Sequence, residues 1–176
     1  MKNLRYALLL IVGAGLVAMV ATMAFATRSA SGGGGDPNGP PVSPEIRQML
    51  HDVSADRIQQ TIEKLVPFGT RHTLSSQTDP NRGIGAATNW VFDQFQQYAA
   101  TSDGRMTVEK QSFVQPPGPR NPNPVTVTNV IATLHGTQPE SANRIYVVSG
   151  HLDSRVTDVL NFDSFEPGAD DDGSGV

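Results

Sequence analysis

The sequence contains no cysteine among its 176 residues and only 4 histidines. The lack of cysteine excludes disulfide bonds, thiolate zinc sites, cysteine nucleophiles and lipid attachment at a cysteine. Any bound metal ion must therefore be held by histidine nitrogens and carboxylate oxygens. With 38% hydrophobic and 17% charged residues, the composition is that of one globular domain plus some unstructured sequence.

Basic residues are scarce in the last part of the chain, where acidic residues are concentrated. Residues 151–176 hold one basic residue, Arg155, and seven of the 17 acidic residues: Asp153, Asp158, Asp163, Glu166, Asp170, Asp171 and Asp172. A short stretch rich in carboxylates suits cations better than phosphates. We therefore expect a cation-binding segment and no nucleic-acid partner.

A long apolar run lies at the N-terminus. Lys2 and Arg5 precede the uncharged residues 6–27, and the run ends near Ala24-Phe25-Ala26, which is typical of a signal cleavage site. The run is close to the ~20 residues that cross a bilayer. Residues 1–26 are therefore predicted to be a secretory signal peptide or an uncleaved signal anchor. In both cases the rest of the chain is exported, secreted or periplasmic, and only an uncleaved N-terminal segment contacts a membrane.

A linker is predicted after this segment. Residues 27–42 are rich in glycine and proline and contain almost nothing apolar to bury, so a packed core cannot include them. Residues 43–176 are predicted to form the folded part.

Three segments of the folded part have apolar residues at helical spacing. Ser43-Pro44-Glu45 provides an N-cap, a proline in the first turn and an early acid for a first helix. Its apolar residues are Ile46, Met49, Leu50 and Val53. Ser54 caps a second helix, which Pro67 and Gly69 end. The apolar stripe of a third, longer helix consists of Ala87, Val91, Phe95 and Tyr98.

Three further segments have the composition of strands. Residues 106–115 have the pattern of a strand, and residues 125–135 are rich in β-branched residues. The two segments flank a proline-rich connection, which predicts two adjacent antiparallel strands. Ile145-Tyr146-Val147-Val148 is apolar without alternation, which is typical of a central strand covered on both faces. The predicted class is therefore α/β.

Two polar stretches follow this predicted central strand. Gly150-His151-Leu152-Asp153-Ser154 places His151 at the carboxyl end of the strand, where open α/β sheets bind ligands. Pro167-Gly168-Ala169 then leads into Asp170-Asp171-Asp172-Gly173-Ser174-Gly175. Three adjacent carboxylates repel one another, and a bound cation relieves the repulsion. Together the two stretches predict a metal site.

These two stretches resemble the signature of metallopeptidase family 28, the co-catalytic di-zinc aminopeptidases. The resemblance implies a three-layer α/β sandwich around a mixed central sheet, and two zinc ions as cofactors. It implies that His151 binds one zinc, that Asp171 bridges both, and that Asp153 orients the His151 imidazole. It also implies a cis peptide bond between Asp171 and Asp172. The implied activity is that of an aminopeptidase, which removes N-terminal residues from peptides with a free N-terminus outside the cytoplasm.

The resemblance extends more weakly upstream, through Phe68-Gly69-Thr70-Arg71-His72, and covers residues 45–176. One departure is Asp170, where the family often has Asn. The larger departure is that the family's adjacent Glu-Glu pair, a further Asp and a distant His are not found in the chain. They would lie beyond Val176, so we expect a chain truncated at the C-terminus that is inactive alone.

Two other interpretations remain open from the sequence. One is an exported, non-catalytic module that binds calcium through its acidic stretch. The other keeps the di-zinc fold but catalyses carboxypeptidase or glutaminyl-cyclase chemistry, both known among the family's relatives. We assign structural roles to the remaining histidines, His51, His72 and His135. Gly173-Ser174-Gly175 is not a serine-nucleophile motif, because Asp172 and Val176 stand where glycines are required.

Overall fold

A computed structural model of the protein describes residues 43–176. The predicted signal segment, residues 1–26, and the predicted linker, residues 27–42, lie outside the described residues. Pro44–Val176 form one compact unit. Within residues 43–176, no helix is long and apolar enough to cross a bilayer.

The unit begins with two helices, α1 (Pro44–Asp52) and α2 (Ala55–Leu65), as the sequence predicts. The Ser54 hydroxyl caps α2 by accepting a hydrogen bond from the Arg57 backbone N–H at 3.3 Å. After α2 the chain makes a short 3-10 helix, η1 (Val66–Phe68), and turns at Gly69 with a φ of 72°. A positive φ is adopted most easily by glycine, which explains why the helical segment ends there.

The predicted amphipathic helix is present as α1, but its apolar face is not part of the core. No residue of α1 is buried, and Met49 and Leu50 are exposed. Helical spacing shows that a helix has an apolar face, but it does not show which other part of the protein packs against that face.

Helix α3 (Gly83–Ala100) is the longest element of the described residues and contacts η1 and the two strands that follow it. Its buried residues all lie in its first half, whereas Tyr98, predicted to extend the apolar stripe, is exposed. The small residues at the start of α3 permit a close approach to the preceding loop. A Cβ on Gly85 would lie 2.2 Å from the backbone oxygen of Gln77.

The core lies where α2, η1 and the start of α3 meet. Its buried apolar residues are Leu65, Phe68, Ala86 and Ala87. Trp90, Leu152 and Val176 pack against them and are partly buried. Because Leu152 adjoins His151, the core anchors the segment that carries the candidate metal ligand.

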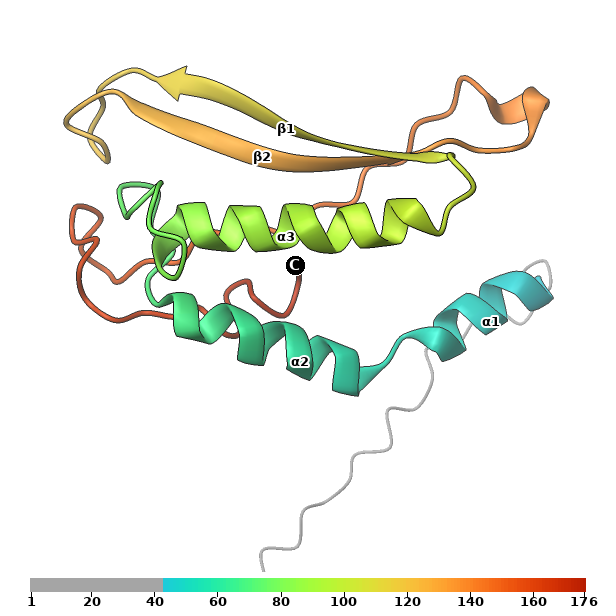
Figure 1. Ribbon diagram of the computed structural model, residues 1–176, viewed down its shortest axis with the longest axis horizontal. Coiled ribbons are helices and arrows are strands. Elements are labelled where there is room, and N and C mark those ends of the chain that lie inside the picture. The colour runs from blue at the N-terminus through green and yellow to red at the C-terminus, as the bar shows by residue number, and fades with distance from the viewer. Residues whose placement is uncertain (1–42) are drawn as a thin grey trace, which may run out of the picture. The chain divides into compact units, whose positions relative to one another are not determined.

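The sheet consists of β1 (Met106–Gln115) and β2 (Val125–Leu134), paired antiparallel as predicted. The register pairs Met106 with Leu134 at one end and Gln115 with Val125 at the other. The two strands run along one side of α3 (Figure 1). A second short 3-10 helix, η2 (Pro139–Ser141), follows β2.

The predicted central strand at residues 145–148 is wrong for this structure. These residues form no strand, and Val148 is 97% exposed. The sheet formed by the described residues is two-stranded, so the three-layer sandwich around a mixed sheet is not formed within them. A strand needs hydrogen-bonding neighbours, and the apolar composition of residues 145–148 cannot supply them by itself.

Candidate metal site

The structure brings together the two residues implied to be zinc ligands. His151 Nε2 lies 2.9 Å from Asp171 Oδ1. The His151 side chain is 54% exposed and that of Asp171 is 91% exposed, so both atoms are open to solvent and to ions. One nitrogen and one carboxylate oxygen therefore converge on a common point at the surface.

Asp153 lies on the other side of the His151 ring. His151 Nδ1 is 3.1 Å from the backbone oxygen of Asp153 and 3.4 Å from its carboxylate Oδ1. With a proton on Nδ1, the ring donates to Asp153 and leaves the Nε2 lone pair directed to the Asp171 side. A metal-binding histidine is oriented in this way by a partner on its second nitrogen.

The charges around His151 favour its protonated form when no metal is bound. Partial burial alone would lower the pKa of His151, but the hydrogen bond to the Asp153 backbone oxygen and the carboxylates of Asp153, Asp171 and Asp172 raise that pKa above its usual value. Both ring nitrogens face oxygen acceptors, so a second proton, which gives the ring its positive charge, is favoured at Nε2. A metal cation satisfies the same requirement as that proton.

The two atoms fit a shared zinc ion closely, though not without a small adjustment. Zinc–nitrogen and zinc–oxygen bonds of about 2.0–2.1 Å in a tetrahedral site place the two ligand atoms about 3.3 Å apart. The 2.9 Å between His151 Nε2 and Asp171 Oδ1 is a few tenths of an ångström shorter. Because Asp171 is so exposed, its carboxylate can move by this amount.

The donor set is nevertheless incomplete within the described residues. Residues 43–176 contain no group of three or more His, Asp or Glu side chains that could hold a metal ion. Catalytic zinc sites use three protein ligands and keep a fourth position open. His151 and Asp171 thus fit part of a zinc site.

The turn that carries Asp171 packs directly against the segment that carries His151. The His151 backbone N–H donates to Asp172 Oδ2 at 3.2 Å. A Cβ on Gly150 would lie 2.3 Å from the backbone oxygen of Gly175. The Asp171-Asp172 peptide bond is cis, as the resemblance implies. Asp172 therefore acts as a hydrogen-bond acceptor that joins the two segments.

His72 has the structural role assigned from the sequence. It is buried, its Nδ1 accepts a hydrogen bond from the Leu74 N–H at 2.9 Å, and its Nε2 lies 3.1 Å from the backbone oxygen of Val159. Both ring nitrogens are therefore engaged by backbone groups, and neither is directed at the His151 site.

From the sequence, Arg71 is only the neighbour of His72 in a possible site pair, for which a structural role is favoured. Its side chain is completely buried and donates to the backbone oxygens of Leu152, Pro167 and Gly168. The weak resemblance to the family at residues 68–72 is the sequence signal that points to Arg71. This signal does not identify the hydrogen-bond partners of Arg71, because they lie far along the chain.

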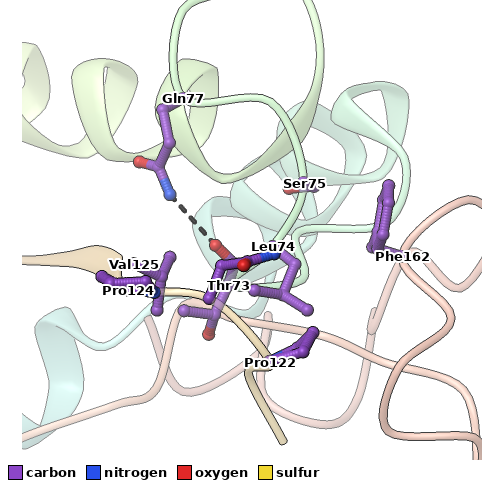
Figure 2. A pocket seen from close by; sticks show the side chains of 9 residues that line it. Thr73, Leu74, Ser75, Gln77, Pro122, Pro124, Val125 and Phe162 are labelled. Atoms are coloured by element: carbon purple, nitrogen blue, oxygen red, sulfur yellow. Dashed lines mark hydrogen bonds between the residues drawn. The ribbon is translucent and has the colours of Figure 1, made fainter. Parts of the chain in front are cut away.

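A surface pocket of about 310 Å³ lies away from these residues. Figure 2 shows it between the loop at residues 73–77, the segment at residues 122–125 and Phe162. Gln77 Nε2 donates to the Thr73 backbone oxygen at 3.0 Å at its rim. None of His151, Asp153 and Asp171 lines this pocket, so the candidate metal site does not open into it.

Part of the chain matches a known protein family. Residues 129–176 match the family described as Peptidase family M28. A "Probable zinc metalloprotease" of Pyrenophora teres f. teres (strain 0-1) is 53% identical over 136 residues, which cover 77% of this chain and 28% of that protein. A "Probable zinc metalloprotease" of Pyricularia oryzae is 52% identical over 132 residues, which cover 75% of this chain and 26% of that protein.

A more distant relative is "Leucine aminopeptidase 1" of Fusarium vanettenii, 29% identical over 132 residues that cover 75% of this chain and 29% of that protein. The chain thus spans 26–30% of the length of the curated relatives it matches. No solved structure matches it significantly. From the family match and these relatives together, the chain belongs to peptidase family M28.

Proposed function

We propose that the protein is a zinc-dependent aminopeptidase that acts outside the cytoplasm on peptides with a free N-terminus. The observation that carries this proposal is the convergence of His151 Nε2 and Asp171 Oδ1 to 2.9 Å, with Asp153 on the second nitrogen of the ring. Family M28 membership, which implies the aminopeptidase fold, and the names of the relatives support it.

In the proposed site, His151 would hold one zinc ion and Asp171 would be a ligand shared by both. Zinc supplies Lewis-acid polarisation of the scissile carbonyl and makes a water molecule acidic enough to attack near neutral pH. Asp153 fixes the orientation of the imidazole, which keeps Nε2 directed at the ion. The remaining ligands and the catalytic base are proposed to come from outside the described residues.

The nitrogen of His151 favours zinc over calcium. Calcium takes six to eight oxygen ligands, whereas zinc binds imidazole nitrogen and carboxylate oxygen in small numbers. A calcium site built on the acidic stretch would leave His151 Nε2 without a role, although it lies at the centre of the cluster. This argues against the calcium-binding module.

The export of the protein is proposed from residues 1–26, whose charged start and apolar run are typical of a signal peptide or signal anchor. A membrane-anchored form would be tethered by this segment and keep its site outside the cytoplasm.

The test uses the intact protein as the cell produces it, with His151→Ala, Asp171→Ala and, as a control, Asp163→Ala. Asp163 is an exposed acid of the same region. We expect both ligand variants to lose bound zinc, measured by elemental analysis, and to lose hydrolysis of leucine amide, whereas the control retains both. Unchanged zinc content and activity in Asp171→Ala, or restoration of the chelated protein by calcium instead of zinc, would overturn the assignment.

A second comparison separates the aminopeptidase from the other di-zinc reactions. An aminopeptidase cleaves a leucyl peptide but not its N-acetylated form, because the free amine is part of the recognised group. Cleavage of the acetylated peptide from its C-terminal end would indicate a carboxypeptidase. Ring closure of an N-terminal glutaminyl peptide without peptide-bond cleavage would indicate a cyclase.

A further inference from the structure

We propose that Arg71 is a positioning residue of the metal site, which holds the segment of His151 and the segment of Asp171 at a fixed separation. This inference rests on the proposed function, because it concerns the zinc ligands assigned there. The contacts that carry it are those of the Arg71 side chain and, beside it, those of the Arg71 backbone with Ser154.

The guanidinium of Arg71 contacts both ligand-bearing segments at once. Its Nε donates to the backbone oxygen of Leu152, the residue after His151, at 2.7 Å. Its Nη2 donates to the backbone oxygen of Gly168 at 3.1 Å, and its Nη1 donates to that of Pro167. The Leu152 carbonyl belongs to the His151 segment, whereas the other two carbonyls belong to the turn that leads to Asp171.

Gly168 transmits this contact to Asp171. Its backbone oxygen also accepts a hydrogen bond from the Gly173 N–H at 3.0 Å, which closes the turn around Asp171. Gly168 has a φ of 53°, and a Cβ there would lie 2.6 Å from the Asp171 backbone oxygen and 3.2 Å from Arg71 Nη2. The turn therefore has little room to move relative to the guanidinium.

The backbone of Arg71 is held by the same two segments. Its N–H donates to the Ser154 hydroxyl at 3.0 Å, and that hydroxyl donates to the Glu166 backbone oxygen at 2.6 Å. Next to it, the Thr70 hydroxyl accepts from the Glu166 N–H at 2.8 Å. Thr70, Arg71 and Ser154, called the clasp below, therefore form hydrogen bonds with the His151 segment and with the segment that leads to Asp171.

The chemistry of this contact requires arginine. A planar guanidinium presents donors in fixed directions, and here three of them address three carbonyls on two segments. A lysine ammonium is a single point charge and cannot reach both segments with the same geometry. The Asp153 carboxylate, which lies 3.4 Å from His151 Nδ1, also attracts the Arg71 charge electrostatically.

The experiment compares Arg71→Lys with Arg155→Lys in the intact protein. Arg155 is a matched control, because it lies on the same segment as His151 but is exposed, and among residues 43–176 it donates only to the backbone oxygen of its neighbour Val156. We would measure the zinc dissociation constant by competition with a chelator, the visible spectrum of the cobalt-substituted protein, and the thermal midpoint of the metal-free protein. We expect Arg71→Lys to raise the dissociation constant at least tenfold and to alter the cobalt spectrum, with no change in the control.

Each outcome decides between explanations. If Arg71 serves only the stability of the fold, its variant lowers the thermal midpoint but leaves the dissociation constant and cobalt spectrum of the folded protein unchanged, which overturns the proposal. If the unsubstituted protein binds no zinc, the proposed function itself fails. Should Arg71→Lys not fold, Ser154→Ala decides the matter. A dissociation constant raised at least threefold in Ser154→Ala supports the clasp, and an unchanged one overturns it.

Discussion

His151 Nε2 and Asp171 Oδ1 lie 2.9 Å apart, on two segments that the chain joins by a long loop. The His151 ring is held from its other side by Asp153, and the Asp172 carboxylate accepts a hydrogen bond from the His151 N–H. Two aspartates therefore contact the imidazole, and a third contacts the backbone of the same residue. Their charges determine how the site behaves without metal and how strongly it competes for a cation.

We first predict that His151 of the metal-free protein titrates above the ordinary histidine value of about 6.5. Burial opposes this, but the hydrogen bond to Asp153 and the carboxylates of Asp153, Asp171 and Asp172 raise the pKa. Histidine NMR titration measures it directly. Asp171→Asn should lower the pKa and Asp163→Asn should not. A value at or below the ordinary one in the unsubstituted protein would contradict the geometry.

The same shift gives a pH dependence of stability with a defined sign. Because the folded-state pKa is raised, the contribution of His151 to stability is fully present below the unfolded value of about 6.5 and is lost as the pH rises through the folded-state pKa. The metal-free protein should thus exceed His151→Gln in stability more at about pH 5.5 than at about pH 8.5. Zinc affinity should instead increase with pH, since the proton and the metal compete for His151 Nε2.

The second prediction concerns the core. Leu65→Ala should lower the free energy of unfolding by about 2–5 kcal/mol, because Leu65 is fully buried and its removal leaves a cavity. Met49→Ala is the control. Met49 is exposed on α1, so its replacement should change stability by no more than about 0.5 kcal/mol. Denaturant unfolding followed by circular dichroism compares the two, and equal effects would place the core elsewhere.

A third prediction tests the close approach at the start of α3. Gly85→Ala should lower the thermal midpoint, because its Cβ would lie 2.2 Å from the Gln77 backbone oxygen. Overpacking of this kind costs about 1–3 kcal/mol. That cost outweighs the gain of about 1 kcal/mol in helix propensity. Gly136→Ala should have no comparable effect, since nothing lies within 4 Å of its Cβ position. A Gly85→Ala protein as stable as the parent would refute the packing.

The fourth prediction addresses the exposed apolar residues 145–148. Large exposed apolar surfaces promote association, and Val148 is 97% exposed. Val148→Lys should therefore reduce self-association of the 176-residue chain, measured by light scattering, without changing its circular dichroism. Thr137→Lys adds the same charge to an exposed loop and removes no large apolar side chain. If both variants reduce self-association to the same extent, the added charge and not the loss of apolar surface explains the reduction.

Local elements of the fold could be predicted from the sequence, because their signals are local. The Ser54 cap and the end of α2 near Pro67 and Gly69 depend on residues within a few positions of one another. The strands β1 and β2 follow one another along the chain, so their antiparallel pairing is also predictable. The spacing of apolar residues in α1 predicted its apolar face, but it could not predict that this face is exposed, since spacing does not reveal what packs against a helix. The prediction of a central strand at residues 145–148 was wrong for the same reason.

The candidate site divides in the same way. By itself the sequence determined the identity of the donor types, since the absence of cysteine leaves histidine and carboxylates, and the two motifs pointed to His151, Asp153 and Asp171. Only the tertiary structure decided that His151 and Asp171 face each other, and that Arg71 joins their segments. The Arg71 side chain reaches partners 81 to 97 positions away. No local pattern encodes such contacts, because packing of the whole core brings these backbone carbonyls to one buried guanidinium.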